Sequence, residues 1–277
     1  MNAGGIRGAV LGSPISHSLS PVLHNKAFEL LGIAGSYEAI DVPSGGLANF
    51  LKEHGTEFDY LSLTMPLKEE VLTIAQDLEI SIDALATRIQ SVNTLIRRSS
   101  GWEATSTDGS GFVKALANAG HDHFGSVLIL GAGGTARAVA GALDEIADDV
   151  SIMGRSVRRN AGIASCFTKV NPEFLPWDDH LDLRNFDLIV NTTPSGAADL
   201  VAENIPNKVS GLLFDVLYKP WPTLIARRWS DAGGKVIGGL ELLLYQGIDQ
   251  INLIEPLGHP ILERNQTIDV RYAPEVI

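Results

Sequence analysis

The chain has 277 residues, of which 45% are hydrophobic and 19% are charged, enough apolar mass for one large or two medium globular domains. Its net charge of -12 argues against a nucleic-acid partner, because proteins that bind the phosphate backbone do so with clustered lysine and arginine. Cys166 is the only cysteine, which excludes an intrachain disulfide and a thiolate metal cluster.

The N-terminal residues, 1–7, lack the basic and apolar segments of a secretory leader. No stretch approaches the roughly 20 apolar residues that span a bilayer. We therefore expect a soluble, cytoplasmic protein with a small-molecule substrate and no membrane partner. His121 and His123 flank Asp122, but without further ligands nearby no metal site is predicted. The sequence shows neither a coiled-coil heptad nor an interfacial stripe, so it does not indicate the oligomeric state, and a homodimer is possible.

In the first half, short apolar runs alternate with longer helical stretches, which is typical of strand–helix units around a mainly parallel sheet. Strands are predicted at 8–11, 37–42, 60–64 and 92–96, and helices at 24–31, 47–53 and 69–75. The turn residues 99–101 predict a hairpin whose second strand is 102–106. A helix is predicted at 109–119.

The same alternation starts again after residue 126. Strands are predicted at 127–130, 150–153, 188–191, 212–216 and 236–237, and an apolar helix at 240–254 could return to pack on the first domain. We expect an α/β protein of two domains, 1–110 with 240–277 and 111–239, with a cleft between them.

The clearest local signal opens the second half, where a strand, a glycine turn and a helix follow one another. Gly131 allows a tight turn, Gly133 lets the backbone approach a pyrophosphate, and Ala136 permits close helix–sheet contact. Free amides and the helix dipole stabilise the anion. This pattern favours a Rossmann-like, doubly wound dinucleotide-binding domain over a purely structural turn. The cofactor-binding residues that we assign to this turn are Gly131, Ala132, Gly133, Gly134, Thr135 and Ala136.

The next predicted strand is followed by cations where an NAD-binding protein would offer a carboxylate to the ribose. Arg155, Ser156, Arg158 and Arg159 lie there, and guanidinium groups can bind the 2′-phosphate of NADP with charge-assisted hydrogen bonds. We predict NADP(H) as cofactor, bound by Arg155, Ser156 and Arg159. The alternative for Arg158 and Arg159 is a solvated helix face.

Three segments of the first half carry candidate chemistry. Ser18 and Ser20 lie two apart in a polar loop, so their hydroxyls could face the same ligand, although Ser20 followed by Pro21 is also a good helix N-cap. Lys68 and Asp108 each lie where an apolar segment ends. A lysine and a carboxylate that meet in a cleft can transfer a proton, although an exposed salt bridge is the plainer alternative.

Together these segments resemble the shikimate dehydrogenase family over nearly all the chain. The similarity lies in four motifs, at 12–24, 64–68, 91–94 and 107–111, and in later segments at 191–196, 215–223 and 238–246. The sequence departs from the usual family pattern at Ser62, Ser106, Gly154 and Leu242, which leaves quinate open as a substrate.

The resemblance implies roles for individual residues. Lys68 and Asp108 would be catalytic, and Ser18 and Ser20 would hold the substrate carboxylate. The further substrate-binding residues would be Thr64, Asn93, Tyr218 and Gln246, and the further cofactor-binding residues Thr192, Thr193, Pro194, Val216 and Gly239. Plainer alternatives stay open: Asn93 and Gln246 as backbone hydrogen-bonders, Tyr218 as a half-buried aromatic and Thr193 as a turn former.

The implied reaction is the reversible NADPH-dependent reduction of 3-dehydroshikimate to shikimate, a step of the pathway to chorismate and the aromatic amino acids. A related dehydrogenase with another ring polyol as substrate, and a non-catalytic NADP-binding sensor, are the alternatives.

Overall fold

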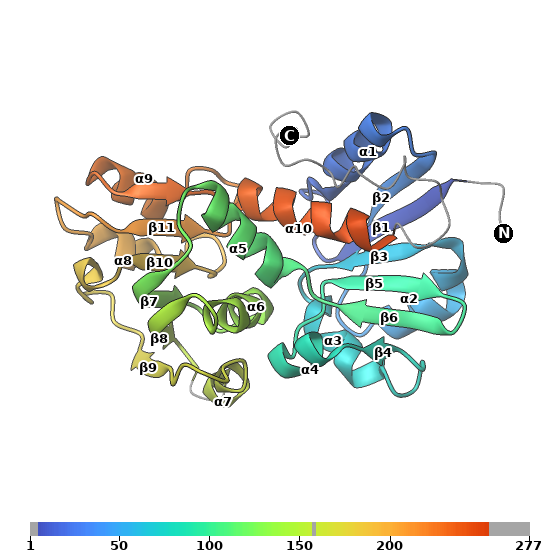
Figure 1. Cartoon of the computed structure of the whole chain (residues 1–277), viewed down its shortest axis with the longest axis horizontal. Coiled ribbons are helices and arrows are strands. Elements are labelled where there is room, and N and C mark those ends of the chain that lie inside the picture. The colour runs from blue at the N-terminus through green and yellow to red at the C-terminus, as the bar shows by residue number, and fades with distance from the viewer. Residues whose placement is uncertain (1–4, 157–158, 255–277) are drawn as a thin grey trace. The chain divides into compact units, whose positions relative to one another are not determined.

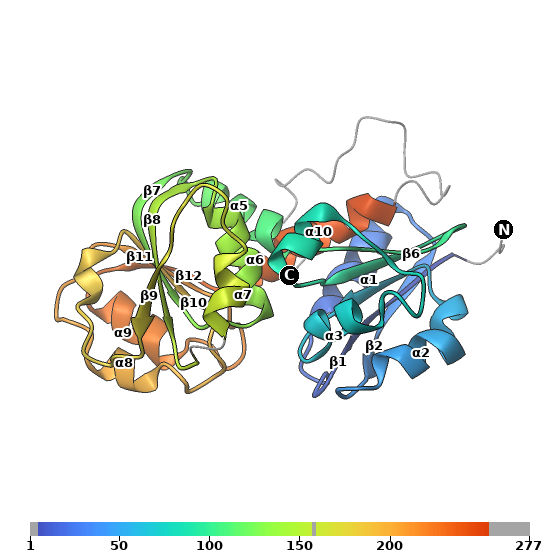
Figure 2. The same cartoon turned by 90° about the horizontal axis from the view of Figure 1, so that it is seen from below.

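The computed structural model describes residues 5–156 and 159–254. They form two compact units: the first runs to Thr107 and resumes at Leu243, and the second is Asp108–Leu242. Figures 1 and 2 show that each unit is a sheet with helices packed on it. The predicted α/β class is confirmed, and each unit is described by itself below.

The first unit has a six-stranded mixed sheet with the order β2-β1-β3-β5-β6-β4. Its strands are β1 (Ile6–Gly12), β2 (Gly35–Asp41), β3 (Tyr60–Leu63), β4 (Ser81–Ile82), β5 (Thr94–Arg98) and β6 (Gly101–Thr105). β1 pairs in parallel with β2 and β3, whereas β5 runs antiparallel to both β3 and β6. The predicted β5–β6 hairpin is confirmed, and it turns the otherwise parallel sheet into a mixed one.

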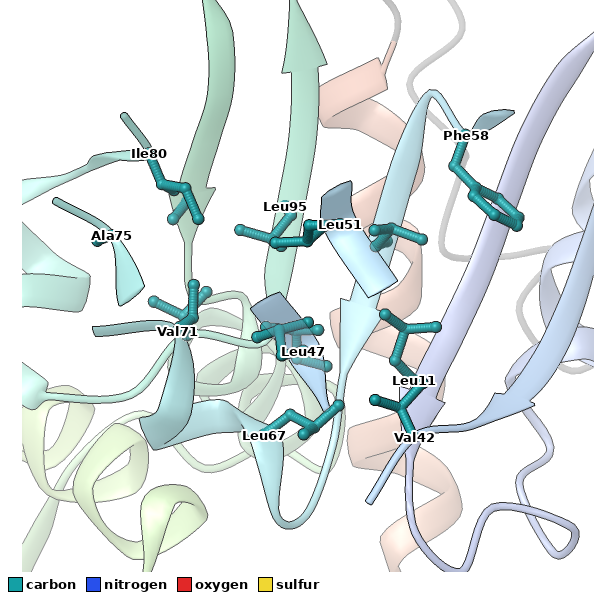
Figure 3. Packing of buried hydrophobic residues seen from close by; sticks show 14 of the residues in the cluster. Leu11, Val42, Leu47, Leu51, Phe58, Leu67, Val71, Ala75, Ile80 and Leu95 are labelled. Atoms are coloured by element: carbon teal, nitrogen blue, oxygen red, sulfur yellow. The ribbon is translucent and has the colours of Figure 1, made fainter. Parts of the chain in front are cut away.

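The helices of the first unit are α1 (Ser20–Leu31), α2 (Leu47–His54), α3 (Leu67–Ile74), α4 (Ala84–Ile89) and the part of α10 (Gly239–Ile254) from Leu243 onward, with a 3-10 turn, η1, at Gly55–Glu57. One apolar cluster joins α2 and α3 to the sheet, and Figure 3 shows Leu47 and Val71 close to Leu95 in it. A second cluster contains Ile254 of α10 with Val10 and Phe28. The prediction that the last helix packs on the first domain is confirmed.

The second unit has a six-stranded sheet with the order β12-β11-β10-β7-β8-β9, in which every pairing is parallel. Its strands are β7 (Phe124–Leu130), β8 (Ala147–Gly154), β9 (Glu173–Pro176), β10 (Leu188–Asn191), β11 (Leu212–Asp215) and β12 (Lys235–Ile237). Because the chain crosses from β8 and β9 back to β10 beside β7, the order reverses at β7. That reversal is the arrangement of a Rossmann-like sheet.

Helices cover both faces of this sheet, as Figure 2 shows. They are α5 (Asp108–Asn118), α6 (Gly134–Leu143), α7 (Asn160–Ala164), α8 (Asp199–Glu203) and α9 (Leu224–Asp231), with a 3-10 turn, η3, at Leu183–Asn185. Trp229 of α9 packs with Leu213 on one face. Phe214 instead contacts Phe112 of α5, with ring centroids 4.9 Å apart. Neighbouring residues of β11 thus pack on opposite faces of the sheet, as a doubly wound sheet requires.

Candidate active site

The β5–β6 hairpin and helix α10 bring three polar residues, Asn93, Thr107 and Gln246, into one buried cluster. Thr94 of β5 pairs with Thr105 of β6, which places Asn93 beside Thr107. Asn93 Oδ1 accepts from the Thr107 backbone N–H at 2.8 Å, and Asn93 Nδ2 donates to Thr107 Oγ1 at 3.0 Å and to Gln246 Oε1 at 3.2 Å. The structure therefore brings together two predicted substrate residues, Asn93 and Gln246.

Lys68 and Asp108 each adjoin this cluster through the backbone. Lys68 is the second residue of α3, and its carbonyl oxygen accepts from the N–H of Val92, the residue before Asn93, at 2.9 Å. Asp108 follows Thr107 directly, is buried and begins α5. Both residues stand at the first turn of a helix. The pairing of their side chains stays a prediction.

Thr64 and the serine loop lie at the ends of β3 and β1. The backbone N–H of Thr64 donates to the carbonyl of Leu11 at 2.9 Å, which fixes Thr64 just beyond the strand. Ser20 is the first residue of α1 and Leu19 holds the N-cap position, so the N-cap alternative for Ser20 is wrong. Instead, the Ser18 hydroxyl accepts from the Ser20 N–H at 3.3 Å. The hydroxyl of Ser18, not that of Ser20, has a local structural role.

The glycine turn of the second unit has the conformation that its sequence predicts. Gly131 has a φ of 108°, and a Cβ added to it would lie 2.6 Å from Thr192 Oγ1. That combination admits only glycine, because the left-handed backbone and the close hydroxyl both exclude a side chain. Gly134 begins α6, followed by Thr135 and the fully buried Ala136, and the helix has no side-chain cap at Gly133. A helix that starts directly after such a turn directs its dipole and its first amides toward an anion.

Space beside Gly133 and a nearby cation both suit a phosphate group. A Cβ added to Gly133 would meet, apart from its chain neighbours, only Nη1 of Arg159, at 3.8 Å. Arg155 and Ser156 follow the end of β8, and Arg155 is exposed. Arg158 lies outside the described residues. The turn and the Arg159 guanidinium therefore lie together, as binding of a phosphorylated dinucleotide requires.

A second buried network holds the ends of β10 and β11. The Asn191 carboxamide accepts from the Thr193 hydroxyl at 2.7 Å and donates to Asp215 at 3.2 Å. The Asp215 carboxylate also accepts from Thr223 Oγ1 at 2.5 Å. Burial raises the pKa of Asp215, while its hydrogen bonds to Thr223, the Leu217 N–H and Asn191 act in the opposite direction.

This network fixes the loops that carry the remaining predicted cofactor residues. Thr192 and Pro194 flank Thr193, and the Thr192 hydroxyl donates to the Leu130 carbonyl at 2.7 Å. A Cβ added to Gly239 would lie 2.2 Å from the carbonyl oxygen of Val216, so these two positions are in direct contact. Tyr218 follows three residues after β11. The structure thus gathers two predicted groups of cofactor residues in the second unit, one at the β7 turn and one at the β11 end.

Comparison with known proteins gives consistent results. The family model described as "Shikimate dehydrogenase substrate binding domain" matches residues 10–95. A shikimate dehydrogenase (NADP(+)) of Thermus thermophilus is 37% identical over 245 residues, covering 87% of this chain and 89% of that protein. The chain belongs to the shikimate dehydrogenase family.

Solved structures of the shikimate dehydrogenase family share the fold. The enzyme from Mycobacterium tuberculosis superposes with a TM-score of 0.80 at 33% identity, covering 92% of this chain and 95% of that one. A shikimate 5-dehydrogenase from Thermus thermophilus, in complex with NADP(H) and shikimate, gives a TM-score of 0.78 at 33% identity, with 98% and 100% covered.

The part of the sequence matched by the family model contains Ser18, Ser20, Thr64, Lys68 and Asn93. All five lie in the first unit. Sequence reasoning missed the partners that hold Asn93 in this unit, chiefly Thr107 and Gln250. A signal for Gln250 exists, because it lies four residues after Gln246 and both are buried polar side chains on one helical face.

The described ranges hold no group of three His, Cys, Asp or Glu side chains that could bind a metal ion. None of the helices within residues 5–156 and 159–254 has the length and hydropathy that a membrane crossing needs.

Proposed function

We propose that the protein catalyses the reversible, NADPH-dependent reduction of 3-dehydroshikimate to shikimate in the pathway to chorismate and the aromatic amino acids. The observation that carries the proposal is the buried cluster of Asn93, Thr107 and Gln246, which adjoins the backbones of Lys68 and Asp108. Membership of the family supports it, as does the relative whose structure holds NADP(H) and shikimate.

The proposed substrate residues suit a carboxylated ring polyol. Ser18 and Ser20 offer hydroxyls to the carboxylate, and Thr64, Asn93, Tyr218 and Gln246 offer neutral donors and acceptors to ring hydroxyls. A site built to satisfy hydroxyl groups discriminates strongly against analogues that lack them, because its buried polar groups are then left unpaired.

Lys68 is the proposed proton-transfer group. In the direction of reduction, its ammonium gives a proton to the substrate carbonyl oxygen, and in oxidation the neutral amine takes the proton from the hydroxyl. Asp108 holds the lysine side chain in position and accepts a hydrogen bond from the substrate. NADPH, when bound, supplies the hydride that reduces the carbonyl carbon. The new C–H and O–H bonds together account for the reduction.

The second unit is proposed to bind NADP(H). Gly131, Gly133 and the first turn of α6 hold the pyrophosphate, since there is space beside Gly133 and the helix dipole favours an anion at this end. Arg155, Ser156 and Arg159 bind the 2′-phosphate, which supports NADP over NAD. Thr192, Thr193, Pro194, Val216 and Gly239 form the loops proposed to contact the nicotinamide ribose.

Cytoplasmic location and a homodimer complete the proposal. Cell fractionation tests the first, and size-exclusion chromatography with light scattering tests the second. A mass in solution equal to that of one chain, 29.6 kDa, would contradict the dimer.

The activity is tested with the purified protein by following formation of reduced nicotinamide. Shikimate and quinate are each offered with NADP and with NAD. We expect shikimate with NADP to give the highest kcat/KM. A higher value with quinate would make the protein a quinate dehydrogenase, and no turnover in any of the four mixtures would indicate a non-catalytic NADP-binding sensor.

A further inference from the structure

Five buried side chains of the first unit form one continuous chain of hydrogen bonds that ends at Asn93. The Tyr37 hydroxyl bonds to Ser62 Oγ at 2.5 Å, and Ser62 Oγ bonds to Gln250 Oε1 at 2.8 Å. Gln250 Nε2 donates to Thr94 Oγ1 at 2.9 Å. Thr94 Oγ1 bonds in turn to Asn93 Oδ1 at 2.7 Å.

The backbone fixes the direction of every bond in this chain. Gln250 Nε2 also donates to the backbone carbonyl of Asn93 at 3.2 Å, and a carbonyl oxygen can only accept. The amide NH₂ of Gln250 therefore faces Asn93, and its Oε1 faces Ser62. It follows that Ser62 donates to Gln250, that Tyr37 donates to Ser62, and that Thr94, which accepts from Gln250, donates its own proton to Asn93.

Asn93 is thereby left with only its NH₂ group to offer. Its Oδ1 accepts from the Thr94 hydroxyl and from the Thr107 backbone N–H, which uses both lone pairs. Its Nδ2 donates to Thr107 Oγ1 and to Gln246 Oε1. Donors directed at the oxygen of a carboxamide polarise the group, and successive bonds in a chain strengthen one another at low dielectric. The Asn93 NH₂ is thus a strengthened donor.

We propose that Gln250 is a positioning residue for the substrate site, which holds Asn93 so that this residue acts on the ligand as a hydrogen-bond donor only. The inference rests on the proposed function. It predicts that the ring oxygen beside Asn93 replaces Gln246 Oε1 as the acceptor from Nδ2 and, if it is a hydroxyl, donates its own hydrogen bond to Gln246 Oε1. Gln250 is 1% exposed and acts only through Thr94 and Asn93.

A purely structural role of Gln250 predicts other changes in KM than a positioning role does. If Gln250 served only to attach α10 to the sheet, its loss would lower the melting temperature and would affect shikimate and NADP alike. A positioning role weakens the recognition of one ring oxygen, so the KM for shikimate rises while the KM for NADP does not change.

The test uses Gln250→Met, which keeps the length of the side chain and removes its hydrogen bonds. It also uses Thr94→Val, which removes the Thr94 hydroxyl, and Thr94→Ser, which keeps it. Gln250→Met and Thr94→Val should each raise the KM for shikimate by about 10-fold, the loss of one hydrogen bond to a buried group. Thr94→Ser should stay within about 2-fold of the wild type. Leu51→Ala, in the apolar cluster with α2 and α3, is the control for lost stability.

Two further readouts separate the possibilities. In the double variant Gln250→Met with Thr94→Val, the second change should add less than about 2-fold, because the chain is already broken. Deoxy analogues of shikimate each lack one ring hydroxyl. The analogue that lacks the ring oxygen beside Asn93 should bind to the wild type and to Gln250→Met with the same affinity.

The outcomes are distinct. Absence of turnover by the wild type would overturn the proposed function and the inference with it. Normal wild-type turnover with an unchanged KM for shikimate in Gln250→Met and Thr94→Val would overturn the inference alone. A KM increase that Leu51→Ala reproduces, or that Thr94→Ser shares, would also overturn it.

Discussion

His24 should make the stability of the protein depend on pH between about pH 7.5 and pH 5. Its imidazole is fully buried, stacks on the Tyr37 ring with centroids 4.0 Å apart, and is joined to the Tyr60 hydroxyl through Nδ1 at 2.7 Å. Its Nε2 is buried with no hydrogen-bond partner in the described structure. Burial lowers the pKa of His24 from 6.5 to about 3, while the Gln250 carboxamide acts in the opposite direction.

The sign and size of the effect follow from proton linkage. Below pH 6.5 the unfolded chain protonates His24 and the folded chain does not, so stability is fully present above that pH and is lost as the pH falls toward 3. At pH 5 the loss from this one group is about 2 kcal/mol, since each pH unit below the unfolded pKa costs about 1.4 kcal/mol. Tyr37 and Tyr60 add nothing in this range, because burial raises the pKa of both hydroxyls.

The measurement is urea unfolding at both pH values for wild type and His24→Phe, which keeps an aromatic ring beside Tyr37. The loss of the Tyr60 hydrogen bond lowers the stability of the variant equally at both pH values. The difference in unfolding free energy between pH 7.5 and pH 5 should therefore be about 2 kcal/mol smaller in the variant. Equal pH dependence in the two proteins would refute the assignment of a buried, neutral His24.

Two further predictions concern the second unit. Asp144→Ala should lower the free energy of unfolding by about 3 kcal/mol, because the buried carboxylate accepts from the backbone N–H groups of residues 168–170. Urea unfolding at neutral pH measures this loss, with Asp149→Ala, at an exposed position, as the control. A change in unfolding free energy below about 1 kcal/mol would contradict the prediction. Arg159→Ala should raise the KM for NADP by about 10-fold or more through loss of a charge-assisted bond, with little change for NAD. The control, Arg184→Ala, removes an exposed ion pair with Asp182 and should leave the KM for NADP and the KM for NAD unchanged. If Arg159→Ala changes the KM for NADP and the KM for NAD equally, Arg159 does not bind the 2′-phosphate.

The sequence predicted the parts of the fold that are governed by strong local patterns. The buried strands of the second unit are continuous apolar runs, and the glycine turn at Gly131 needs a backbone that other residues avoid. The hairpin was predictable from the turn residues 99–101. The strand β4 has two residues and the helices α7 and α8 have five each, too few for a periodic pattern. The strand β9 ends in Pro176 at the edge of its sheet, where an alternating apolar pattern is not required.

In the candidate site, too, the residues in local sequence motifs were predictable and the tertiary contacts were not. Asn93 and Gln246 were predicted, because the sequence motifs around them are specific. Their hydrogen-bond partners were not, because Tyr37 and Gln250 reach Asn93 only through tertiary contacts between segments that are distant in the sequence. The start of α1 was misjudged: the helix was predicted from residue 24, whereas it begins at Ser20 with Leu19 at the N-cap position and no side-chain cap, so the usual capping signal is missing.

The role of Lys68 as proton-transfer group is tested most directly by Lys68→Ala, assayed with shikimate and NADP together with a direct measurement of shikimate binding. The exposed Lys52→Ala of the same unit is the matched control. We predict that kcat falls by roughly 100-fold or more, while the affinity for shikimate weakens only modestly and Lys52→Ala keeps the wild-type rate. Near-normal turnover by Lys68→Ala would contradict it.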